Sequence, residues 1–393
     1  MNGLFLALNA GSSSLKFAIF DADNASTVPL IRGNIAGIGT APRFTAKDSA
    51  GLMRDADTLR ALDTSADHDR VIALLLPWIA SKLEQRPLLG VGHRVVHGGQ
   101  FYDQPTLITP SVIEQLETLV SLAPLHQPHN IAAIRAVAKW HPKTPQIGCF
   151  DTSFHRTQSR LAQLFALPRS LTDEGIMRYG FHGLSYDYIA SVLPDHLGPL
   201  ASGRVIAAHL GNGSSMCAMK DRQSVATTMG FTALDGLMMG RRCGALDPGV
   251  VLYLMQSKGL SAAEIETLLY KQSGLLGVSG LSNDMQALQL SDDPNAQEAI
   301  ALFCYRAASN LAALIPSIGG LDAIVFTAGI GENSAIVRKL ICEQIDWLGV
   351  QLDQSANERG DTIISAPASS LKVLVIPTNE ELVVARACHK QLA

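Results

Sequence analysis

A turn near the N-terminus combines the residue types that bind phosphate. The segment 4–20 reads LFLALNAGSSSLKFAIF, so two apolar runs flank a turn with Gly11, three serines and Lys16. Glycine lets the backbone approach a ligand, while amides, hydroxyls and a lysine can donate to phosphoryl oxygens. Taken alone, the segment could equally be an ordinary β-hairpin with a serine-rich turn.

The same pattern recurs in the second half of the chain. Residues 205–219 read VIAAHLGNGSSMCAM, and Gly213-Ser214-Ser215 aligns with Gly11-Ser12-Ser13. Two hairpins of this kind in separate halves of one chain predict a duplicated domain. We expect their turns to face each other across the phosphates of a nucleotide.

Two arginines stand beside glycines, where a planar guanidinium could hold a carboxylate or phosphoryl group. Arg94 lies in GHRVVHGG (92–99) and Arg242 in GRRCGALDP (240–248). A basic surface turn is the alternative for Arg242. We infer that the two arginines, one from each half, clamp an anion.

Two carboxylates and one histidine follow or interrupt apolar segments. Asp151 follows an apolar run at 146–150, and Glu380 follows another at 372–376. Magnesium needs only one or two protein carboxylates when phosphates supply other ligands, although either residue could instead cap a helix. His182, in RYGFHG, suits a hydrogen-bond donor to a transferring group, with a buried structural histidine as the alternative. The segment 122–129 is interpreted as a pocket-lining loop.

Zinc is not expected at the histidine pair or at the cysteines. His93 and His97 have the i, i+4 spacing of zinc proteases, but Arg94 replaces the usual glutamate and Val95-Val96 favours a strand. The six cysteines, at 149, 217, 243, 304, 342 and 388, form no Cys-x-x-Cys pair. Such scattering is typical of reduced thiols.

The elements that position these residues alternate between helix and strand. Hydrophobic periodicity predicts helices over 70–84, 111–121 and 130–140, and strands over 89–96 and 146–150. The second half repeats the plan, with a strand pair at 204–219, helices near 249–258, 261–270 and 296–315, and strands at 323–327 and 372–376. Ser261 and Glu264 predict a capping box, and 327–333 a glycine-rich turn before a helix. This alternation indicates an α/β fold.

Length and composition agree with a two-domain enzyme. The chain has 393 residues, 47% hydrophobic and 17% charged, with a net charge of −4. This charge provides no general attraction to nucleic acid or to an anionic membrane. The apolar stretch 311–331 is interrupted by Pro316 and glycines, so we expect no membrane span. No basic residue precedes the apolar run at 4–8, so we expect no signal peptide and a cytoplasmic protein.

Taken together, these segments closely resemble the acetate kinase family, within the superfamily that also contains actin, sugar kinases and large heat-shock chaperones. The resemblance spans nearly the whole chain and rests on segments in family order, namely 9–16, 92–99, 179–183, 209–213, 326–333 and 377–381. It implies a duplicated ribonuclease H-like (actin-like ATPase) two-domain α/β fold with the active site in the interdomain cleft. The implied domains are 1–152, completed by a C-terminal helix at 382–393, and 153–381.

The resemblance also implies an activity, which is reversible transfer of a phosphoryl group from ATP to acetate. The products are acetyl phosphate and ADP, the cofactor is Mg²⁺ with Mn²⁺ as a substitute, and no covalent enzyme intermediate forms. A homodimer is implied as well. Phosphoryl transfer needs positioning and charge stabilisation more than covalent chemistry, which agrees with this residue set.

Each matching position carries an implied role. Arg94 and Arg242 orient the carboxylate, Asn9 and His182 contact the moving phosphoryl group, and His182 and Arg242 stabilise the transition state. Asp151, Glu380 and Asn9 position the metal. The implied ATP site comprises Ser12, Ser14, Lys16, His209, Leu210, Gly211, Asn212, Gly213, Asp284, Met285, Gln286, Gly329, Ile330, Gly331, Glu332 and Asn333. The implied acyl pocket comprises Val96, Leu125, Phe181 and Ala233.

Two single residues and two short segments depart from the family pattern. Ala233 replaces a usual proline and could enlarge the acyl pocket; since one methylene is worth only about 1–3 kcal/mol, propionate is an alternative substrate. Residues 184–186 read LSY instead of Thr-Ser-His, 240–245 read GRRCGA instead of Gly-Thr-Arg-Ser-Gly-Asp, and Gln286 replaces an arginine near the adenosine. An alternative of another class is a chaperone-like or actin-like nucleotide switch.

Overall fold

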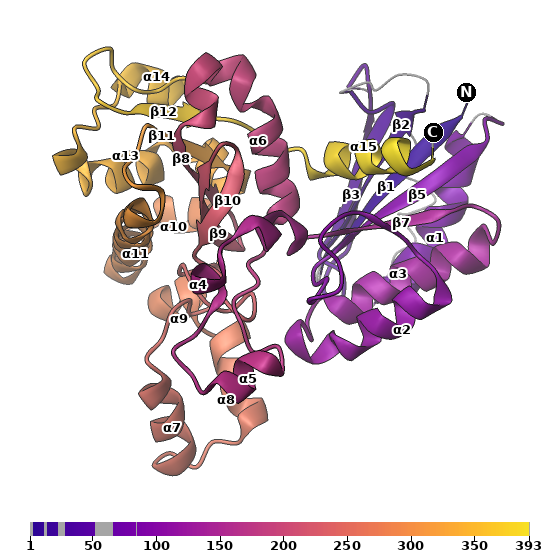
Figure 1. Ribbon diagram of the computed structural model, residues 1–393, viewed down its shortest axis with the longest axis horizontal. Coiled ribbons are helices and arrows are strands. Elements are labelled where there is room, and N and C mark those ends of the chain that lie inside the picture. Colours follow the sequence, from indigo (N-terminus) through magenta and orange to yellow (C-terminus); the bar gives the residue numbers. More distant parts are fainter. Residues whose placement is uncertain (1–2, 12–13, 23–27, 52–65, 84, 393) are drawn as a thin grey trace. The chain divides into compact units, whose positions relative to one another are not determined.

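The chain forms two compact α/β units (Figure 1). The computed structural model describes residues 3–11, 14–22, 28–51, 66–83 and 85–392. Unit 1 comprises Met1–Phe154 and Asn379–Ala393, and unit 2 comprises His155–Thr378. The chain therefore leaves unit 1 once and returns to it with its C-terminal helix.

Unit 1 contains a seven-stranded mixed sheet in the order β4-β3-β2-β1-β5-β7-β6. β1 runs parallel to β5, and β5 runs parallel to β7, so these three strands end at one edge. Carboxyl ends of parallel strands are where α/β folds collect ligand-binding residues. The strands are β1 (Leu4–Ala10), β2 (Ser14–Asp21), β3 (Ile31–Ala36), β4 (Arg43–Asp48), β5 (Leu88–Val95), β6 (Thr106–Leu107) and β7 (Gln146–Phe150).

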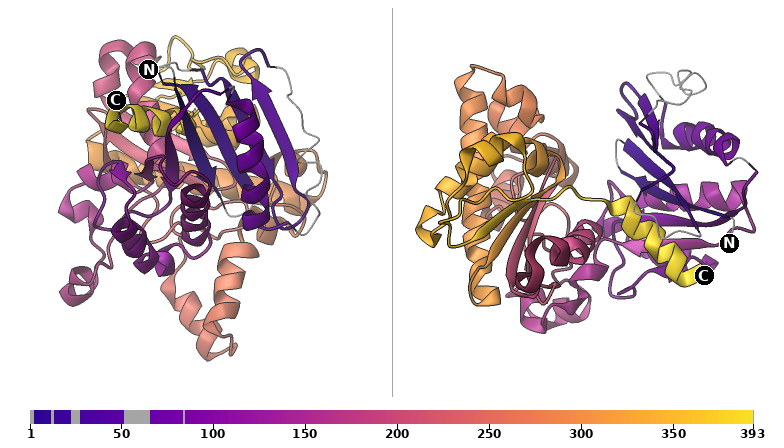
Figure 2. Two further views of the ribbon diagram at one scale, coloured as in Figure 1. Left: turned by 90° about the vertical axis from the view of Figure 1, so that its right-hand side faces the viewer. Right: turned by 90° about the horizontal axis from the view of Figure 1, so that it is seen from above.

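Helices cover both faces of this sheet (Figures 1 and 2). α1 (His68–Lys82) and α3 (Gln127–Trp140) pack together, α2 (Pro110–Thr118) packs on α3, and α15 (Glu380–Leu392) packs on β1, β5 and β7. Gly92 allows that approach, because an added Cβ would lie 2.3 Å from Val384 Cγ1 of α15. On the other side, Val91, Ala133 and Val137 share one apolar core.

Unit 2 repeats the central topology of unit 1. Its five-stranded sheet has the order β10-β9-β8-β11-β12, with β8, β11 and β12 parallel to one another and β9 and β10 antiparallel. The same arrangement joins β3, β2, β1, β5 and β7 of unit 1. The strands are β8 (Arg204–Leu210), β9 (Ser214–Lys220), β10 (Gln223–Thr227), β11 (Ala323–Thr327) and β12 (Lys372–Val375).

Helix α11 is the central helix of the unit 2 core. Length and composition alone would allow it to cross a membrane, which the sequence analysis did not anticipate. It packs on β8, β9 and β10, and Phe303, Ala307 and Leu311 belong to the apolar core of the unit, so we interpret it as a core helix. The helices of unit 2 are α4 (Arg160–Gln163), α5 (Arg169–Asp173), α6 (Gly183–Leu197), α7 (Pro248–Gln256), α8 (Ala262–Lys271), α9 (Gly274–Ser279), α10 (Met285–Gln289), α11 (Pro294–Ile318), α12 (Ala328–Asn333), α13 (Ala335–Glu343) and α14 (Gln354–Arg359).

The two serine-containing hairpins recur as predicted, but their letter-by-letter alignment is wrong. In the first hairpin Ala10 pairs with Leu15, and in the second Leu210 pairs with Ser214. Gly11 therefore occupies the position of Gly211, not that of Gly213, and the second turn is one residue shorter. The same residue types occupy different positions in the two turns, because the pairing of the strands, and not the composition of the turn, sets the register.

Three local predictions have clear outcomes. The capping box is confirmed, because Glu264 N donates to Ser261 Oγ and Ser261 N donates to Glu264 Oε2. The glycine-rich stretch after β11 is different from the prediction, because 328–333 is itself the short helix α12. Likewise, the predicted loop at 122–129 ends early, since α3 begins at Gln127.

Candidate active site

Parallel strands bring three polar residues to one edge of unit 1. Asn9 lies near the end of β1, Arg94 near the end of β5, and Asp151 follows β7. All three are buried or half-buried, with Asp151 Oδ atoms reached by Arg94. Sequence positions far apart therefore form one cluster, as the strand-end argument predicts.

Arg94 is the centre of this cluster. Its Nε and Nη2 donate to the two Asp151 oxygens at 2.8 and 2.6 Å, and its Nη1 donates to Asn9 Oδ1 at 3.1 Å. Asn9 Nδ2 in turn donates to Glu380 Oε2 at 3.0 Å. The Arg94 side chain keeps 16% of its surface exposed, so its planar fork is both held and reachable.

The charges of the cluster shift its ionisation. Burial lowers the pKa of Arg94, but Asp151 and Glu380 outweigh it and raise that pKa above its usual value. Burial and the neighbouring Glu380 raise the pKa of Glu381, while Lys16 lowers it. Arg94 is therefore a permanent cation at physiological pH, available to an anionic substrate.

Glu380 is not the cap of the C-terminal helix. It is the first residue of α15, and the Asn379 side chain accepts from Leu382 N at 3.1 Å. This leaves the Glu380 carboxylate within the cluster, with Asn9 Nδ2 as its donor. Asp151 is paired with Arg94 in the same way. The helix-cap alternative is therefore wrong for Glu380, and for Asp151 it stays open.

The phosphate-type turn of unit 1 lies beside this cluster. Lys16 pairs with Asn9 across β1 and β2, and Gly11 N donates to the Ser14 carbonyl at 2.8 Å. Ser12 lies outside the described residues. Ser14 begins β2 at the end of the turn.

Two buried amides that the sequence analysis missed tie this edge together. Asn130 accepts from Val96 N at 2.9 Å and donates to the Ala10 carbonyl at 2.7 Å, so it links the ends of β1 and β5. Gln127 accepts from His97 N and donates to the His97 carbonyl. In the sequence, the only signal for these bonds is that Asn130 begins the predicted helix over 130–140 and that Gln127 lies shortly before it.

In unit 2, two histidines stack near the start of α6 and the end of β8. The rings of His182 and His209 have centroids 4.1 Å apart at 19°. Ser215 Oγ lies 2.8 Å from His182 Nδ1, and Ser185 Oγ lies 2.8 Å from His209 Nδ1. These contacts hold Nδ1 of each ring and fix the orientation of both imidazoles.

Gly213 is the meeting point of His182 and Arg242. A Cβ added at Gly213 would lie 2.8 Å from Arg242 Nη2 and 3.2 Å from His182 Nε2, so a side chain there would displace the Arg242 guanidinium. Arg242 Nη1 donates to the Ala233 carbonyl at 2.5 Å. A guanidinium and an imidazole thus converge on a glycine turn, an arrangement that suits an anion.

Four residues of unit 2 other than glycine have left-handed backbones, and two of them, His182 and Ala328, stand at the start of a helix. His182 has φ 58° at the start of α6, and Ala328 has φ 65° at the start of α12. Left-handed conformations are unfavourable for residues with a Cβ and concentrate at functional sites.

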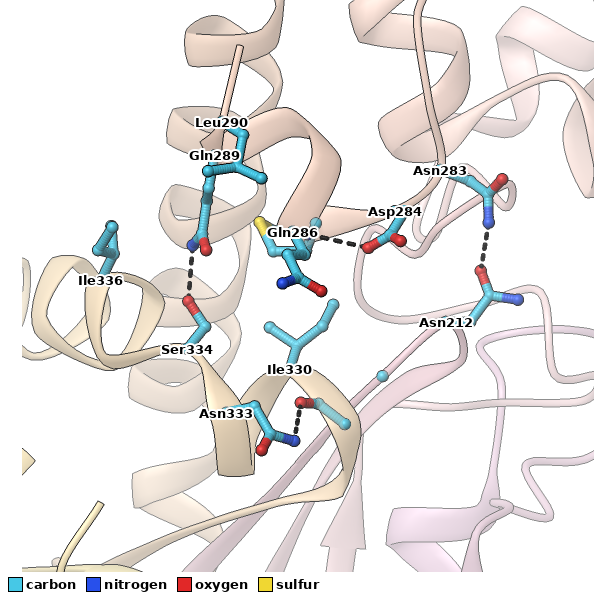
Figure 3. A pocket seen from close by; sticks show the side chains of 13 residues that line it. Asn212, Asn283, Asp284, Gln286, Gln289, Leu290, Ile330, Asn333, Ser334 and Ile336 are labelled. Atoms are coloured by element: carbon cyan, nitrogen blue, oxygen red, sulfur yellow. Dashed lines mark hydrogen bonds between the residues drawn. The ribbon is translucent and has the colours of Figure 1, made fainter. Parts of the chain in front are cut away.

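A cavity of about 810 Å³ lies wholly within unit 2 (Figure 3). It is lined by eight residues of the implied ATP site, namely Gly211, Asn212, Asp284, Met285, Gln286, Gly329, Ile330 and Asn333, and also by Asn283, Gln289, Leu290, Ser334 and Ile336. Its volume lies in the range of small-molecule pockets. The residues of the second group were not predicted from the sequence; among them Gln289 lies on α10 and Ile336 on α13.

The other implied ATP residues stand outside the cavity lining. Leu210 belongs to the unit 2 core, and His209 and Gly213 lie on the histidine side. Gly331 is buried, and its carbonyl accepts from Arg338. Glu332 accepts from Ala328 N at 2.7 Å and Thr378 N at 3.0 Å, so it braces α12.

The implied acyl residues divide between the units. Val96 is buried and Leu125 is half-buried in unit 1, whereas Phe181 is buried and Ala233 is half-buried in unit 2. Ala233 stands beside Arg242 through its carbonyl. The acyl pocket therefore stays a prediction.

The metal predictions concern the donor groups of the described residues. Among these residues no cluster of three or more histidine, cysteine or acidic side chains could hold a metal, and His93 and His97 are buried. Asp151 and Glu380 instead share Arg94, which lies 2.6 Å from one and 3.9 Å from the other. Two carboxylates fit Mg²⁺ when phosphates complete its ligands.

A duplicated α/β fold with a nucleotide-sized cavity and two arginine clusters defines a phosphotransferase. A family model described as the acetokinase family matches residues 4–386. Acetate kinase of Rhodopseudomonas palustris (strain ATCC BAA-98 / CGA009) is 55% identical over 98% of both chains, and that of Rhizobium meliloti is 47% identical over 97% of this chain and 96% of the relative.

Two solved kinase structures have folds similar to that of this chain. A propionate kinase from Francisella tularensis subsp. tularensis SCHU S4 has a TM-score of 0.89 at 36% identity over 98% of both chains. Porphyromonas gingivalis acetate kinase has a TM-score of 0.85 at 33% identity over 100% of both. The chain belongs to the acetokinase family, and its fold is the actin-like ATPase two-domain fold.

Proposed function

We propose that this protein transfers the γ-phosphoryl group of ATP reversibly to acetate, giving acetyl phosphate and ADP. The observation that carries the proposal is the pair of arginines, each presented with a hydrogen-bonding partner set beside a glycine-rich turn. The acetate kinases named above support the substrate. We further propose direct in-line displacement, without a covalent intermediate.

In this proposal the side chains supply position and charge. Arg94 and Arg242 hold the acetate carboxylate and the equatorial phosphoryl oxygens, and His182 Nε2 donates to the phosphoryl group. Asn9 orients Arg94 through its Oδ1. Preorganised donors of this kind stabilise a transition state in which charge spreads over the oxygens.

Asp151 and Glu380, with Asn9 beside them, would hold Mg²⁺, or Mn²⁺ in its place. When bound, the ion supplies charge neutralisation for the phosphate oxygens of ATP. Arg94 donates to both Asp151 oxygens and its Nε lies 3.9 Å from Glu380 Oε2, so a cation already faces both carboxylates. The base and ribose are assigned to the cavity beside Asp284, Gly329 and Ile330.

Propionate is the second candidate acceptor. The propionate kinase from Francisella tularensis has the same fold, and Ala233 stands where the family usually has proline. A pocket larger by a methylene changes discrimination by only about 10- to 200-fold. We assign acetate as the preferred acid and propionate as a slower one.

Helix α7 suggests the surface for a homodimer. The structure buries none of its side chains within the chain, and Leu252, Tyr253 and Met255 are each about half exposed. Exposed apolar patches of this kind mark protein interfaces. We propose a homodimer that uses α7, in a cytoplasmic enzyme whose six cysteines are free thiols.

An acid panel tests the proposal. Purified protein with MgATP and each acid is expected to form acyl phosphate, trapped as the hydroxamate, with kcat/KM for acetate at or above that for propionate. Absence of trapped product with every acid would overturn the function. An advantage of more than about tenfold for propionate would overturn the assignment of acetate.

A further inference from the structure

Two helices hold the carbonyls that lead into the phosphate-type turn of unit 1. Asn130 of α3 donates to the Ala10 carbonyl at 2.7 Å. His68, the first residue of α1, places Nε2 2.6 Å from the Gly11 carbonyl oxygen. Because a carbonyl oxygen only accepts, His68 Nε2 carries the hydrogen and donates it.

A hydrogen bond to a backbone carbonyl oxygen constrains the whole peptide group. The peptide group is planar, so an oxygen held in place orients the peptide plane to which it belongs. Ala10 and Gly11 are the last residues before the serines, and Gly11 N also donates to the Ser14 carbonyl. The entry to the turn is thus fixed by backbone and side-chain bonds together.

His68 itself is firmly held. It is buried, and its ring stacks on that of His129 with centroids 3.9 Å apart at 20°. Asp67 caps α1 by accepting from Arg70 N, and α1 packs on α3. His129 lies next to Asn130, so one turn of α3 supports both carbonyl donors.

We propose that His68, stacked on His129, is a positioning residue for Gly11, the first residue of the phosphate-type turn of unit 1. The proposal rests on the proposed function, which assigns this turn to the phosphates of ATP. His68 acts through the Gly11 carbonyl and contacts no substrate. A histidine that merely filled the core would be replaceable by another aromatic ring.

Three variants separate the contributions of the His68 hydrogen-bond donor, of its aromatic ring and of its stacking on His129. His68→Phe keeps a ring against His129 but removes the donor, whereas His68→Gln keeps a donor of similar reach and removes the ring. His129→Leu removes the stack and leaves the His68 donor. Thermal unfolding confirms that each variant is folded, and calorimetry gives dissociation constants for MgATP and for AMP.

The expected change in MgATP affinity corresponds to the loss of one hydrogen bond. We expect His68→Phe to weaken MgATP about three- to tenfold, His129→Leu to weaken it less, and His68→Gln to restore it to within about twofold. AMP affinity should not change, because its cavity lies in unit 2. KM for acetate should also stay the same.

The outcomes distinguish this inference from the proposed function. Wild-type affinity of His68→Phe for MgATP overturns the positioning role, and so does a loss that His68→Gln fails to restore. Equal weakening of MgATP and AMP overturns it too, because that indicates a general structural effect. A wild-type protein that binds MgATP but forms no acetyl phosphate contradicts the proposed function and leaves the affinity comparison valid.

Discussion

At the scale of single residues, Arg94 joins groups from three parts of the chain. Its guanidinium reaches Asp151 and Asn9, and Glu380 lies 3.9 Å from its Nε. The sequence could predict this arginine and both carboxylates, because each stands at a strand end. It could not predict their pairing, which depends on the parallel order of β1, β5 and β7.

Replacing Arg94 should remove most of the activity. Arg94→Ala is expected to lower kcat about 10³- to 10⁵-fold by comparison with arginine fingers. Arg94→Lys keeps the charge but loses the planar fork, so it should recover only part of the rate. Steady-state kinetics measures both. Arg135→Ala is the matched control, since its pair with Glu117 is exposed, and activity lost equally there would contradict the assignment.

Buried histidines predict an acid-sensitive fold. Burial lowers the pKa of His93, His97 and His155 to about 4, below the unfolded value of 6.5. The unfolded chain therefore binds protons first, and stability present above pH 6.5 is lost as pH falls toward 4, by up to roughly 3 kcal/mol for each histidine. Urea unfolding across this range should show a falling free energy of unfolding. A constant value would contradict the burial argument.

At the scale of elements, the sequence predicted whether a segment is a helix or a strand better than it predicted the hydrogen bonds between segments. Helix and strand positions followed from periodicity, and the hairpins followed from their repeated turns. The turn register was wrong, and Gln127 and Asn130 were missed, because amide hydrogen bonds to distant backbone groups leave no periodic signal. The cavity residues Gln289 and Ser334 were also missed, because the hydrogen bond between their side chains leaves no periodic signal in the sequence.

The packing of α15 on the unit 1 sheet depends on glycine. Gly92→Ala would place a Cβ 2.3 Å from Val384 Cγ1 and 2.8 Å from Cys388 Sγ. Overpacking of this kind costs about 1–3 kcal/mol, so chemical unfolding should show that loss. Gly329→Ala is the control for stability, because nothing lies within 4 Å of its Cβ, and an equal loss there would contradict the packing argument.

At the scale of the whole molecule, one sheet topology serves two purposes. Unit 1 carries the carboxylates with Arg94, whereas unit 2 carries the cavity, the stacked histidines and Arg242. The duplication was visible in the sequence as two hairpins, and the family followed from ordered segments. Acid selectivity was not, because Val96 and Leu125 belong to one unit while Phe181 and Ala233 belong to the other.

Phosphorus NMR tests the central claim most directly, because it shows where the γ-phosphoryl group goes. With wild-type protein, MgATP and acetate, the γ-phosphate signal should be replaced by an acetyl phosphate signal in equal amount to ADP. Without acetate, neither product should accumulate. Formation of ADP and inorganic phosphate at the same rate with and without acetate would contradict the account and indicate a nucleotide switch instead.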